Sequence, residues 1–367
     1  MSSKNTSYRI EHLDACRGIA ATFVVASHCL QSVDIDKQWS ALRVALGHIP
    51  VVFFFVLSGY VLGRSLLKAQ IDTRFYAAYS IKRFFRLVPL LVVVFFWSFM
   101  AAKFINPNRS FSIPLSQWAV NLSNWMAQVT TISQFLENIL LIQRGLNIPT
   151  WTIKVELVCS LALPILVLVL RRNRILAIFT LLVFSFLGSH FFGQIFGLNG
   201  GDITLIEAIR YTYLFLFGFT LCGIEDFFSE QRKLSAVALL FIATMALLWS
   251  IWVPWGEDLT QGVLITGIMA VLIPLPFPMA KVFLSARIPV VLGNLSYGIY
   301  LFHTPVLLFL IAGPVTPWLG SSGGAARFPW LFVQVFILTL GLSYLAFKFV
   351  ERPLNQVGHL LAGVIKR

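Results

Sequence analysis

The sequence predicts an all-α, polytopic membrane protein with about ten transmembrane helices and both termini in the cytoplasm. First, 58% of its 367 residues are hydrophobic and only 12% are charged, whereas soluble domains carry roughly 25% charged residues. Second, the apolar residues form long blocks such as "LVPLLVVVFFWSFMAA", and blocks of about 20 residues suit a hydrocarbon core roughly 30 Å thick. Third, the cations fall in short segments between these blocks. A soluble globular domain is therefore excluded.

The formal net charge of +13 would also be typical of a nucleic-acid-binding protein. Here the cations lie in short loops between apolar blocks, as membrane orientation requires, so we expect membrane lipids and no nucleic acid as partners. The four cysteines, Cys16, Cys29, Cys159 and Cys222, fall in or beside apolar segments without metal-ligand spacing. They are expected to be small buried side chains, and no metal site is expected.

Hydropathy gives the order of the expected elements. The ten expected spans are 13–33, 47–67, 87–106, 150–170, 175–196, 203–223, 234–253, 259–279, 288–311 and 328–349. The first span lacks a small-x-small cleavage site at its end, so it is expected to be a retained helix and not a signal peptide. The amphipathic stretch "FLENILLIQ" predicts a short interfacial helix within 130–144.

Loop charge predicts the orientation. The segment 64–86 holds six cations and one acid, Asp72; the cations are Arg64, Lys68, Arg74, Lys82, Arg83 and Arg86. Further cations follow the fourth span and close the chain. With the N-terminus inside, all of these segments are cytoplasmic, in agreement with the positive-inside rule. The segment 107–147 is expected to be an external loop, and the whole chain a single domain.

The stretch "RGIAATFVVASH" places Arg17 and His28 on one helix. Eleven residues at about 100° each complete three turns plus about 20°, so the two side chains share a face and lie about 16 Å apart along the axis. Ionisable groups at membrane depth are costly and usually face a protein interior or a water-filled cavity. A structural alternative is that Arg17 extends to the surface while His28 hydrogen-bonds a neighbouring helix.

Other polar side chains are expected at the depth of His28, in the outer half of the membrane. They are His48, Glu156 in "WTIKVE", and Ser296, Tyr297 and His303 in "LSYGIYLFHTP". His303 has the alternative of an interhelical hydrogen bond, and Tyr297 that of packing with a satisfied hydroxyl.

A second set of polar residues lies toward the inside: Arg17, Arg64, Arg83 and Arg86. In "RFFR", the i, i+3 spacing of Arg83 and Arg86 points both side chains the same way on a helix. Clustered guanidinium groups suit phosphate. The alternatives are a topology signal or binding of anionic lipid.

These residues resemble, in order, the motifs of the acyltransferase-3 family of membrane-bound acyltransferases. The matching stretches are "HLDACRG" with Asp14 and Arg17, the spacing to His28, "FFFVLSGYVL" with Ser58, "RFFR", "WTIKVE" with Trp151 and Glu156, "LGNLSYGIYLFHTPV", and "VERP". The similarity runs from about residue 8 to residue 353. The sequence departs from the family pattern at Lys154, where a small or polar residue is common, and at Leu157, where a second Glu often follows.

The resemblance implies transfer of an acyl group, usually acetyl, from acetyl-CoA to a hydroxyl of a glycan or lipid-linked saccharide, as in the modification of surface polysaccharides and exopolysaccharides. It also implies a multi-pass enzyme of the plasma (inner) membrane that needs no metal. Many members carry a C-terminal esterase-like domain. The chain ends shortly after its tenth expected span, so we expect no such domain here.

The two expected depths suit this chemistry. Arg83, Arg86 and Arg64 would hold the phosphates of the donor, with Arg17 further in. His28, whose side chain titrates near neutral pH, would deprotonate the acceptor hydroxyl, and Glu156 would orient His28 or relay its proton. Alternatively, His28 takes the acyl group covalently. The residues expected to bind substrate or support the site are Asp14, His48, Ser58, Trp151, Arg210, Ser296, Tyr297 and His303.

Two rival functions fit some of these features. Membrane-embedded Arg, His and Glu side chains are also typical of proton relays in a transporter or a glycolipid flippase, but no internal repeat is visible. Glu207 and Arg210, spaced i, i+3, would equally form a structural ion pair. A purely structural membrane subunit would not explain why arginine and histidine side chains gather at two depths in the membrane. The sequence predicts no oligomeric state.

Overall fold

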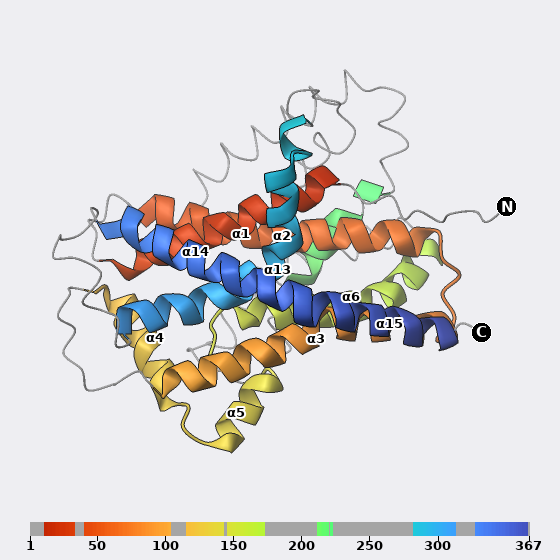
Figure 1. The fold of residues 1–367 in the computed structure, drawn as a ribbon. Helices are drawn as coiled ribbons and strands as arrows, with labels where there is room; N and C mark the ends of the chain where they lie inside the picture. Colours follow the sequence, from red (N-terminus) through yellow and green to blue (C-terminus); the bar gives the residue numbers. More distant parts are fainter. Residues whose placement is uncertain are drawn as a thin grey trace, which may run out of the picture.

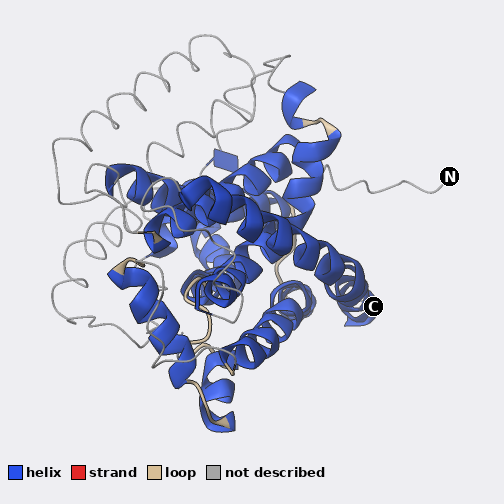
Figure 2. Ribbon diagram, turned by 60° about the vertical axis from the view of Figure 1, so that its left-hand side comes forward, coloured by secondary structure: helices blue, strands red, loops and turns tan. Residues whose placement is uncertain are grey.

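The computed structural model describes residues 11–33, 40–103, 115–142, 145–172, 211–219, 221–222, 282–312 and 327–365. These residues form helices joined by short links, with one isolated antiparallel bridge between Val33 and Leu115 (Figure 2). Six of the described helices are long and apolar enough to cross a membrane, so the prediction of an all-α polytopic membrane protein is confirmed. The expected spans 175–196, 234–253 and 259–279, and about half of 203–223, lie outside the described residues.

The helices are labelled in Figure 1. Their bounds are α1 Glu11–Ser32, α2 Ser40–Leu67, α3 Thr73–Ala102, α4 Gln117–Gln128, α5 Ile132–Ile139, α6 Thr150–Arg172, α13 Arg287–Ala312, α14 Phe328–Ala346, the π-helical turn η4 Phe347–Glu351, and α15 Arg352–Ile365.

The third helix begins well before the expected span at residue 87, so the prediction of a basic loop over 64–86 is wrong. Asp72 caps α3, because its carboxylate accepts a hydrogen bond of 2.6 Å from the backbone N–H of Phe75. Only residues 68–72 link α2 to α3. Arg83 and Arg86 therefore lie on a helix, about 15–20 Å from its start. The cations of this first half of α3 lower its mean hydropathy, which is why hydropathy alone places the start too late.

The segment 107–147 is not simply an external loop, because it contains α4 and α5. The expected short helix within 130–144 is confirmed as α5, which begins with a reciprocal capping box between Thr131 and Gln134. Helix α4 is attached to the end of α1. The Ser116 N–H donates to the Ser32 carbonyl (3.1 Å), and the Ser116 hydroxyl donates to the Gln31 carbonyl. These bonds hold α4 over the C-terminal end of α1.

Helix α13 is the most deeply buried of the described membrane-spanning helices, and it crosses α1 at two glycines. A Cβ atom added to Gly18 would lie 2.5 Å from the carbonyl carbon of Leu292, and one added to Gly293 would overlap the carbonyl oxygen of Asp14. Small residues allow helix backbones to approach this closely in a membrane. The crossing therefore fixes the register of α13 against α1.

The last helices, α14, η4 and α15, follow one another without a break. Helix α14 packs against α13 and α1, and η4 and α15 run alongside α3 (Figure 1). Gly358 of α15 packs against the side chain of Phe85 of α3. The link between α2 and α3 and the end of α15 lie at the same end of the bundle, on the right in Figure 1. The cations in or beside the α2–α3 link at this end are Arg64, Lys68 and Arg74.

The glycine crossing makes a stability prediction. Gly293→Ala should lower the free energy of unfolding by about 1–3 kcal/mol, because the added methyl group overlaps the α1 backbone. Gly341→Ala in α14 is the matched control, since no atom lies within 4 Å of its added Cβ. Thermal unfolding of both variants in detergent would measure the difference. Equal stability of G293A and G341A would contradict the close α1–α13 crossing.

Candidate active site

A small pocket lies between α1, α2, α6 and α13. Five residues predicted for the site meet in it from these four helices: Arg17, Ser58, Glu156, Ser296 and Tyr297. The remaining lining is largely apolar and aromatic, formed by Val51, Phe54, Phe55, Thr152, Ile153 and Tyr300. Charged groups thus border a pocket with mainly apolar walls, which is typical of a site for an extended, partly apolar ligand.

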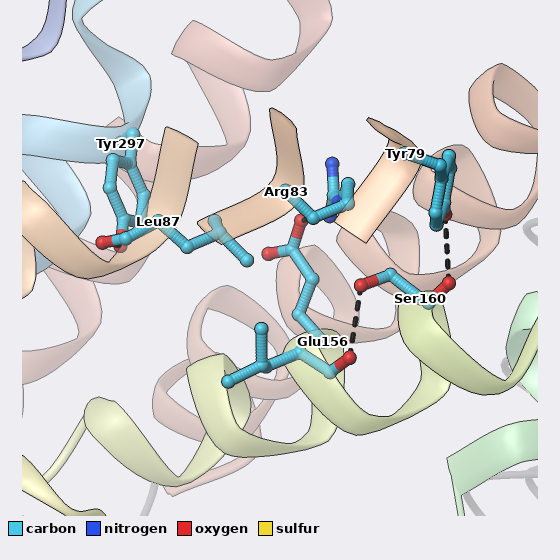
Figure 3. A network of polar contacts seen from close by, with 7 residues as sticks. Tyr79, Arg83, Leu87, Glu156, Ser160 and Tyr297 are labelled. Carbon is cyan, nitrogen blue, oxygen red and sulfur yellow. Dashed lines mark hydrogen bonds and ion pairs between the residues drawn. The ribbon is translucent and has the colours of Figure 1, made fainter. Parts of the chain in front are cut away.

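Arg83 and Glu156 form an ion pair between α3 and α6 at the edge of this pocket (Figure 3). Arg83 Nη2 lies 2.9 Å from Glu156 Oε1, and the two side chains are 9% and 14% exposed. Close by, the Tyr79 hydroxyl donates to the Ser160 carbonyl (2.8 Å) and holds α3 to α6. The structure therefore directs the Glu156 carboxylate to a guanidinium, whereas we had expected it to orient His28.

Arg86 lies one helical turn beyond Arg83 and close enough to Arg17, Arg83 and Glu156 for their charges to act on it. Its side chain is exposed, and it makes no hydrogen bond or ion pair with the residues that the structure describes. Arg17 is half-buried and lines the pocket. We call Arg17, Arg83 and Arg86 the arginine cluster. It offers unused guanidinium donors, suited to an anion, beside the pocket.

His28 and His303 form a second polar centre, the histidine pair. His28 Nδ1 lies 2.8 Å from His303 Nε2, and the two ring centroids are 4.9 Å apart. His303 is completely buried, whereas His28 is half-buried. The α1–α13 crossing explains the contact, because each histidine lies ten residues after its crossing glycine, Gly18 or Gly293.

The partners of His303 determine which nitrogens carry protons. Its Nδ1 lies 3.2 Å from the Ile299 carbonyl oxygen, which can only accept, so this Nδ1 is protonated. In a neutral ring, Nε2 of His303 is then an acceptor, and it lies within reach of the Thr304 hydroxyl (3.1 Å) as well as His28 Nδ1. His28 consequently carries its proton on Nδ1, and its Nε2 keeps a free lone pair. No other hydrogen bond joins the imidazole ring of His28 to the described part of the chain.

Tyr300 connects the pocket to the histidine pair. It lines the pocket, its ring centroid is 5.9 Å from that of His303, and its hydroxyl is hydrogen-bonded to Thr152 (3.0 Å). From the other side, the ring of Trp118 in α4 lies 5.3 Å from the ring of His28. Neither residue was predicted for the site. Tyr300 lies within the quoted motif around His303, and Trp118 lies in the segment 107–147, which we had expected to be an external loop.

Other predicted residues lie apart from these centres. Trp151 packs against Phe55 and Tyr211, with ring centroids 6.2 and 5.2 Å away. Arg64 lies over the ring of Tyr60, 5.8 Å from its centroid.

The three remaining residues predicted for the site are Asp14, His48 and Arg210. Asp14 meets α13 through its backbone carbonyl at the glycine crossing. His48 is half-buried in the first part of α2. Arg210 lies outside the described residues.

Lys154, which stands where the matching motif commonly has a small or polar residue, has a structural role. Its ammonium group donates a hydrogen bond of 3.0 Å to the carbonyl of Leu141. Leu141 has a backbone φ of 57°, in the left-handed region that non-glycine residues rarely adopt. Lys154 thus holds the turn between α5 and α6.

The four cysteines are free thiols, and three of them, Cys29, Cys159 and Cys222, are buried as predicted. Among the described residues, no three His, Cys, Asp or Glu side chains come together as a group that could hold a metal ion.

Comparison with known proteins adds an independent line of information. A family model described as "Acyltransferase domain" matches residues 10–348. No solved structure matches the chain.

Two similar proteins come from Staphylococcus aureus and are provisionally named O-acetyltransferases. The one from strain COL is 24% identical over 373 residues, which cover 95% of this chain and 58% of that protein. The one from strain MSSA476 is 24% identical over 370 residues, covering 94% and 57%. A Rhizobium radiobacter protein named "Protein 2 in picA locus" is 36% identical over 104 residues, covering 28% and 50%. The chain thus spans less than three-fifths of the length of these relatives.

The Arg83–Glu156 pair gives a second prediction. Glu156→Gln removes the carboxylate and leaves Arg83 buried without an anionic partner, so the free energy of unfolding should fall by about 3–5 kcal/mol. Arg83→Met combined with Glu156→Leu should cost clearly less, because neither charge is then stranded. A double-mutant cycle in detergent would measure the coupling. If the effects of the single and double variants simply add, the two side chains are not paired in the folded protein.

Proposed function

Because the chain belongs to the acyltransferase-3 family, whose model covers residues 10–348, we propose that it is a membrane-bound O-acyltransferase. It moves an acyl group, most simply acetyl, from acyl-CoA to a hydroxyl group of a glycan or lipid-linked saccharide. The names of the Staphylococcus aureus relatives support acetyl transfer to oxygen. The donor enters from the cytoplasmic side of the plasma membrane, where the cations at one end of the bundle would lie under the positive-inside rule.

The observation that supports this proposal is a pocket that has guanidinium groups at its edge and a lining residue, Tyr300, next to the histidine pair. The arginine cluster borders the pocket through Arg17 and the Arg83–Glu156 pair. Tyr300 leads from the pocket to His303. Along α1, Arg17 and His28 are about 16 Å apart. An extended donor molecule would bind its phosphates at the cluster and present its thioester near the histidine pair.

In the donor site, Arg86 and Arg17 are the main phosphate ligands, because Arg83 is already paired with Glu156. Guanidinium groups bind phosphate oxygens through two parallel N–H donors. The pantetheine arm follows the pocket wall formed by Phe54, Phe55 and Tyr300. The mainly apolar lining excludes water from the thioester, which protects it from hydrolysis.

In the transfer step, His28 acts as the general base. Its free Nε2 takes the proton of the acceptor hydroxyl while that oxygen attacks the thioester carbonyl. The carbon–sulfur bond breaks, and the CoA thiolate leaves and takes up the proton from His28. His303 keeps the reactive nitrogen of His28 unprotonated in the resting state, because it accepts the Nδ1–H. The same nitrogen would attack the thioester if transfer proceeds through an acyl-histidine, and radiolabel retained on the protein without acceptor would reveal that route.

The function is tested by His28→Gln. The amide keeps hydrogen-bonding capacity but has no basicity, so release of free CoA thiol from acetyl-CoA in the presence of a glycan acceptor should fall at least about 100-fold. Binding of CoA should remain near that of the wild type, because His28 lies beyond the arginine cluster. His359→Gln is the matched control, since His359 is exposed on α15. Near-wild-type transfer by H28Q would show that His28 is structural.

Arg86 should act on donor binding. Arg86→Ala should weaken binding of acetyl-CoA by about 1.5–3 kcal/mol, the usual contribution of a hydrogen bond to a charged group. Arg86→Lys should restore little, because an ammonium group lacks the planar fork. Arg74→Ala, at the exposed start of α3, is the control. Unchanged affinity of R86A in calorimetry would assign Arg86 to membrane orientation alone.

A further inference from the structure

The four amide side chains of α4 point in nearly one direction, and the mechanism above does not use them. They are Gln117, Asn121, Asn124 and Gln128, and we call them the amide row. At about 100° per residue, all four fall within a sector of about 60° around the helix. Three of them are exposed, and Asn124 is half-buried. The amide row is therefore a polar strip on the outside of the protein.

The opposite face of α4 is already packed against protein. Its buried residues are Ala119, Leu122, Ser123 and Met126, and the three apolar ones belong to the same hydrophobic core as residues of α1, α3 and α13. A helix that anchors a protein to a membrane surface usually turns its apolar face to lipid and carries Lys or Arg on its polar face. Helix α4 contains no charged residue. The amide row is therefore not typical of a membrane anchor.

Two tryptophans lie beside the amide row on the surface of the same helix. Trp118 and Trp125 are seven residues apart, so they share a face about 80° from the amide row and are separated by about 10 Å along the axis. The ring of Trp118 lies 5.3 Å from that of His28, whereas Trp125 is 47% exposed. The tryptophan pair thus leads from the proposed general base to the exposed surface of α4.

The polar groups of α4 are ordered before any ligand binds. Gln117 Nε2 donates a hydrogen bond of 2.9 Å to Asn121 Oδ1, and such a pair lies one turn apart on a helix. Gln117 Oε1 and Asn121 Nδ2 make no hydrogen bond with the described residues. Side chains that are already held in place lose less conformational entropy when they bind. The hydrogen bonds of Ser116 to the end of α1 fix the helix itself.

We propose that the amide row and the tryptophan pair bind the saccharide part of the acceptor, a neutral glycan, and present one of its hydroxyl groups to His28. The inference rests on the proposed function, because it names the substrate that the histidine pair would acylate. Amide groups both donate and accept hydrogen bonds, as sugar hydroxyl groups do. A tryptophan ring offers a flat apolar surface with a polar N–H, which suits the C–H face of a pyranose ring. An anionic ligand would require cations, and α4 has none.

The two substrates then approach His28 from opposite ends of the bundle. Helix α4 lies at the end away from the α2–α3 link, on the left in Figure 1. In the orientation of the proposed function, this is the outer end, whereas the donor enters from the cytoplasmic end. Changes on the surface of α4 should therefore alter the KM for the acceptor and leave the KM for the donor unchanged.

The test uses the purified full-length protein, labelled acetyl-CoA and, as acceptor, the surface polysaccharide of cells from which the protein has been deleted. Gln117→Ala combined with Asn121→Ala should raise the KM for this polysaccharide about tenfold, because two hydrogen bonds are lost. Trp125→Ala should raise it by a similar factor, about tenfold, through loss of the stacking surface. The kcat at saturating polysaccharide should change little in both variants, because His28 is intact.

Matched controls remove the same groups elsewhere on the protein. Gln356→Ala changes an exposed amide on α15, and Trp330→Ala changes a tryptophan on α14 that is 57% exposed. Neither control should change the KM for the polysaccharide or for acetyl-CoA.

Three outcomes would overturn the inference. An unchanged KM for the polysaccharide in the α4 variants, with an active wild type, would refute the acceptor surface and leave the proposed function intact; reduced membrane insertion of W125A in that case would identify α4 as an anchor. An equal rise in the KM for both substrates would show that α4 only supports the fold. Failure of the wild type to acetylate the polysaccharide would refute the proposed function and this inference together.

Discussion

The close crossing of α1 and α13 is the contact on which both polar centres depend. Gly18 and Gly293 let the two backbones meet, and a helix of this length is stiff enough to carry that register over several turns. On one side of the crossing, Arg17 of α1 and Ser296 and Tyr297 of α13 line the same pocket. Ten residues beyond it, His28 meets His303. One backbone contact therefore sets the positions of Arg17 and the histidine pair relative to each other.

Charges within the membrane impose a second constraint, because each must find a partner, water or a ligand. Arg83 is neutralised by Glu156, and Tyr79 and Tyr297 bond backbone carbonyls of α6 and α3, respectively. These contacts fix the helices around the pocket. Arg17 and Arg86 are left without direct partners among the described residues. The polar groups of this region thus divide into a paired set that holds the helices and an unpaired set that is available to a ligand.

The histidine pair differs from the familiar arrangement in which a carboxylate orients a catalytic histidine. An ionised carboxylate at this depth would need a cation or hydrogen-bond donors to offset the free energy of burying its charge. Burying a neutral imidazole whose tautomer is fixed by the Ile299 carbonyl costs much less free energy. The hydrogen-bonded chain ends at that carbonyl and does not continue to Glu156, which bonds Arg83. Within the described residues, this termination is compatible with the local proton transfer proposed for His28.

The sequence by itself determined the membrane-spanning class and most of the helices, because long apolar blocks are stable only where hydrocarbon or protein surrounds them. It also indicated Arg17, His28, Arg83, Glu156 and His303 as residues with a role beyond packing, since ionisable groups in apolar helices are rare. The sequence could not place the start of α3, because cations on one face of this helix lower its mean hydropathy although its other face is apolar.

Only the tertiary structure decided which of these groups meet. The partner of Glu156 is Arg83 and that of His28 is His303. Spacing along one helix gives the face and depth of a side chain, but contacts between helices depend on the register and rotation of both. Those are set by backbone packing at glycines that lie far apart in the sequence, as at Gly18 and Gly293.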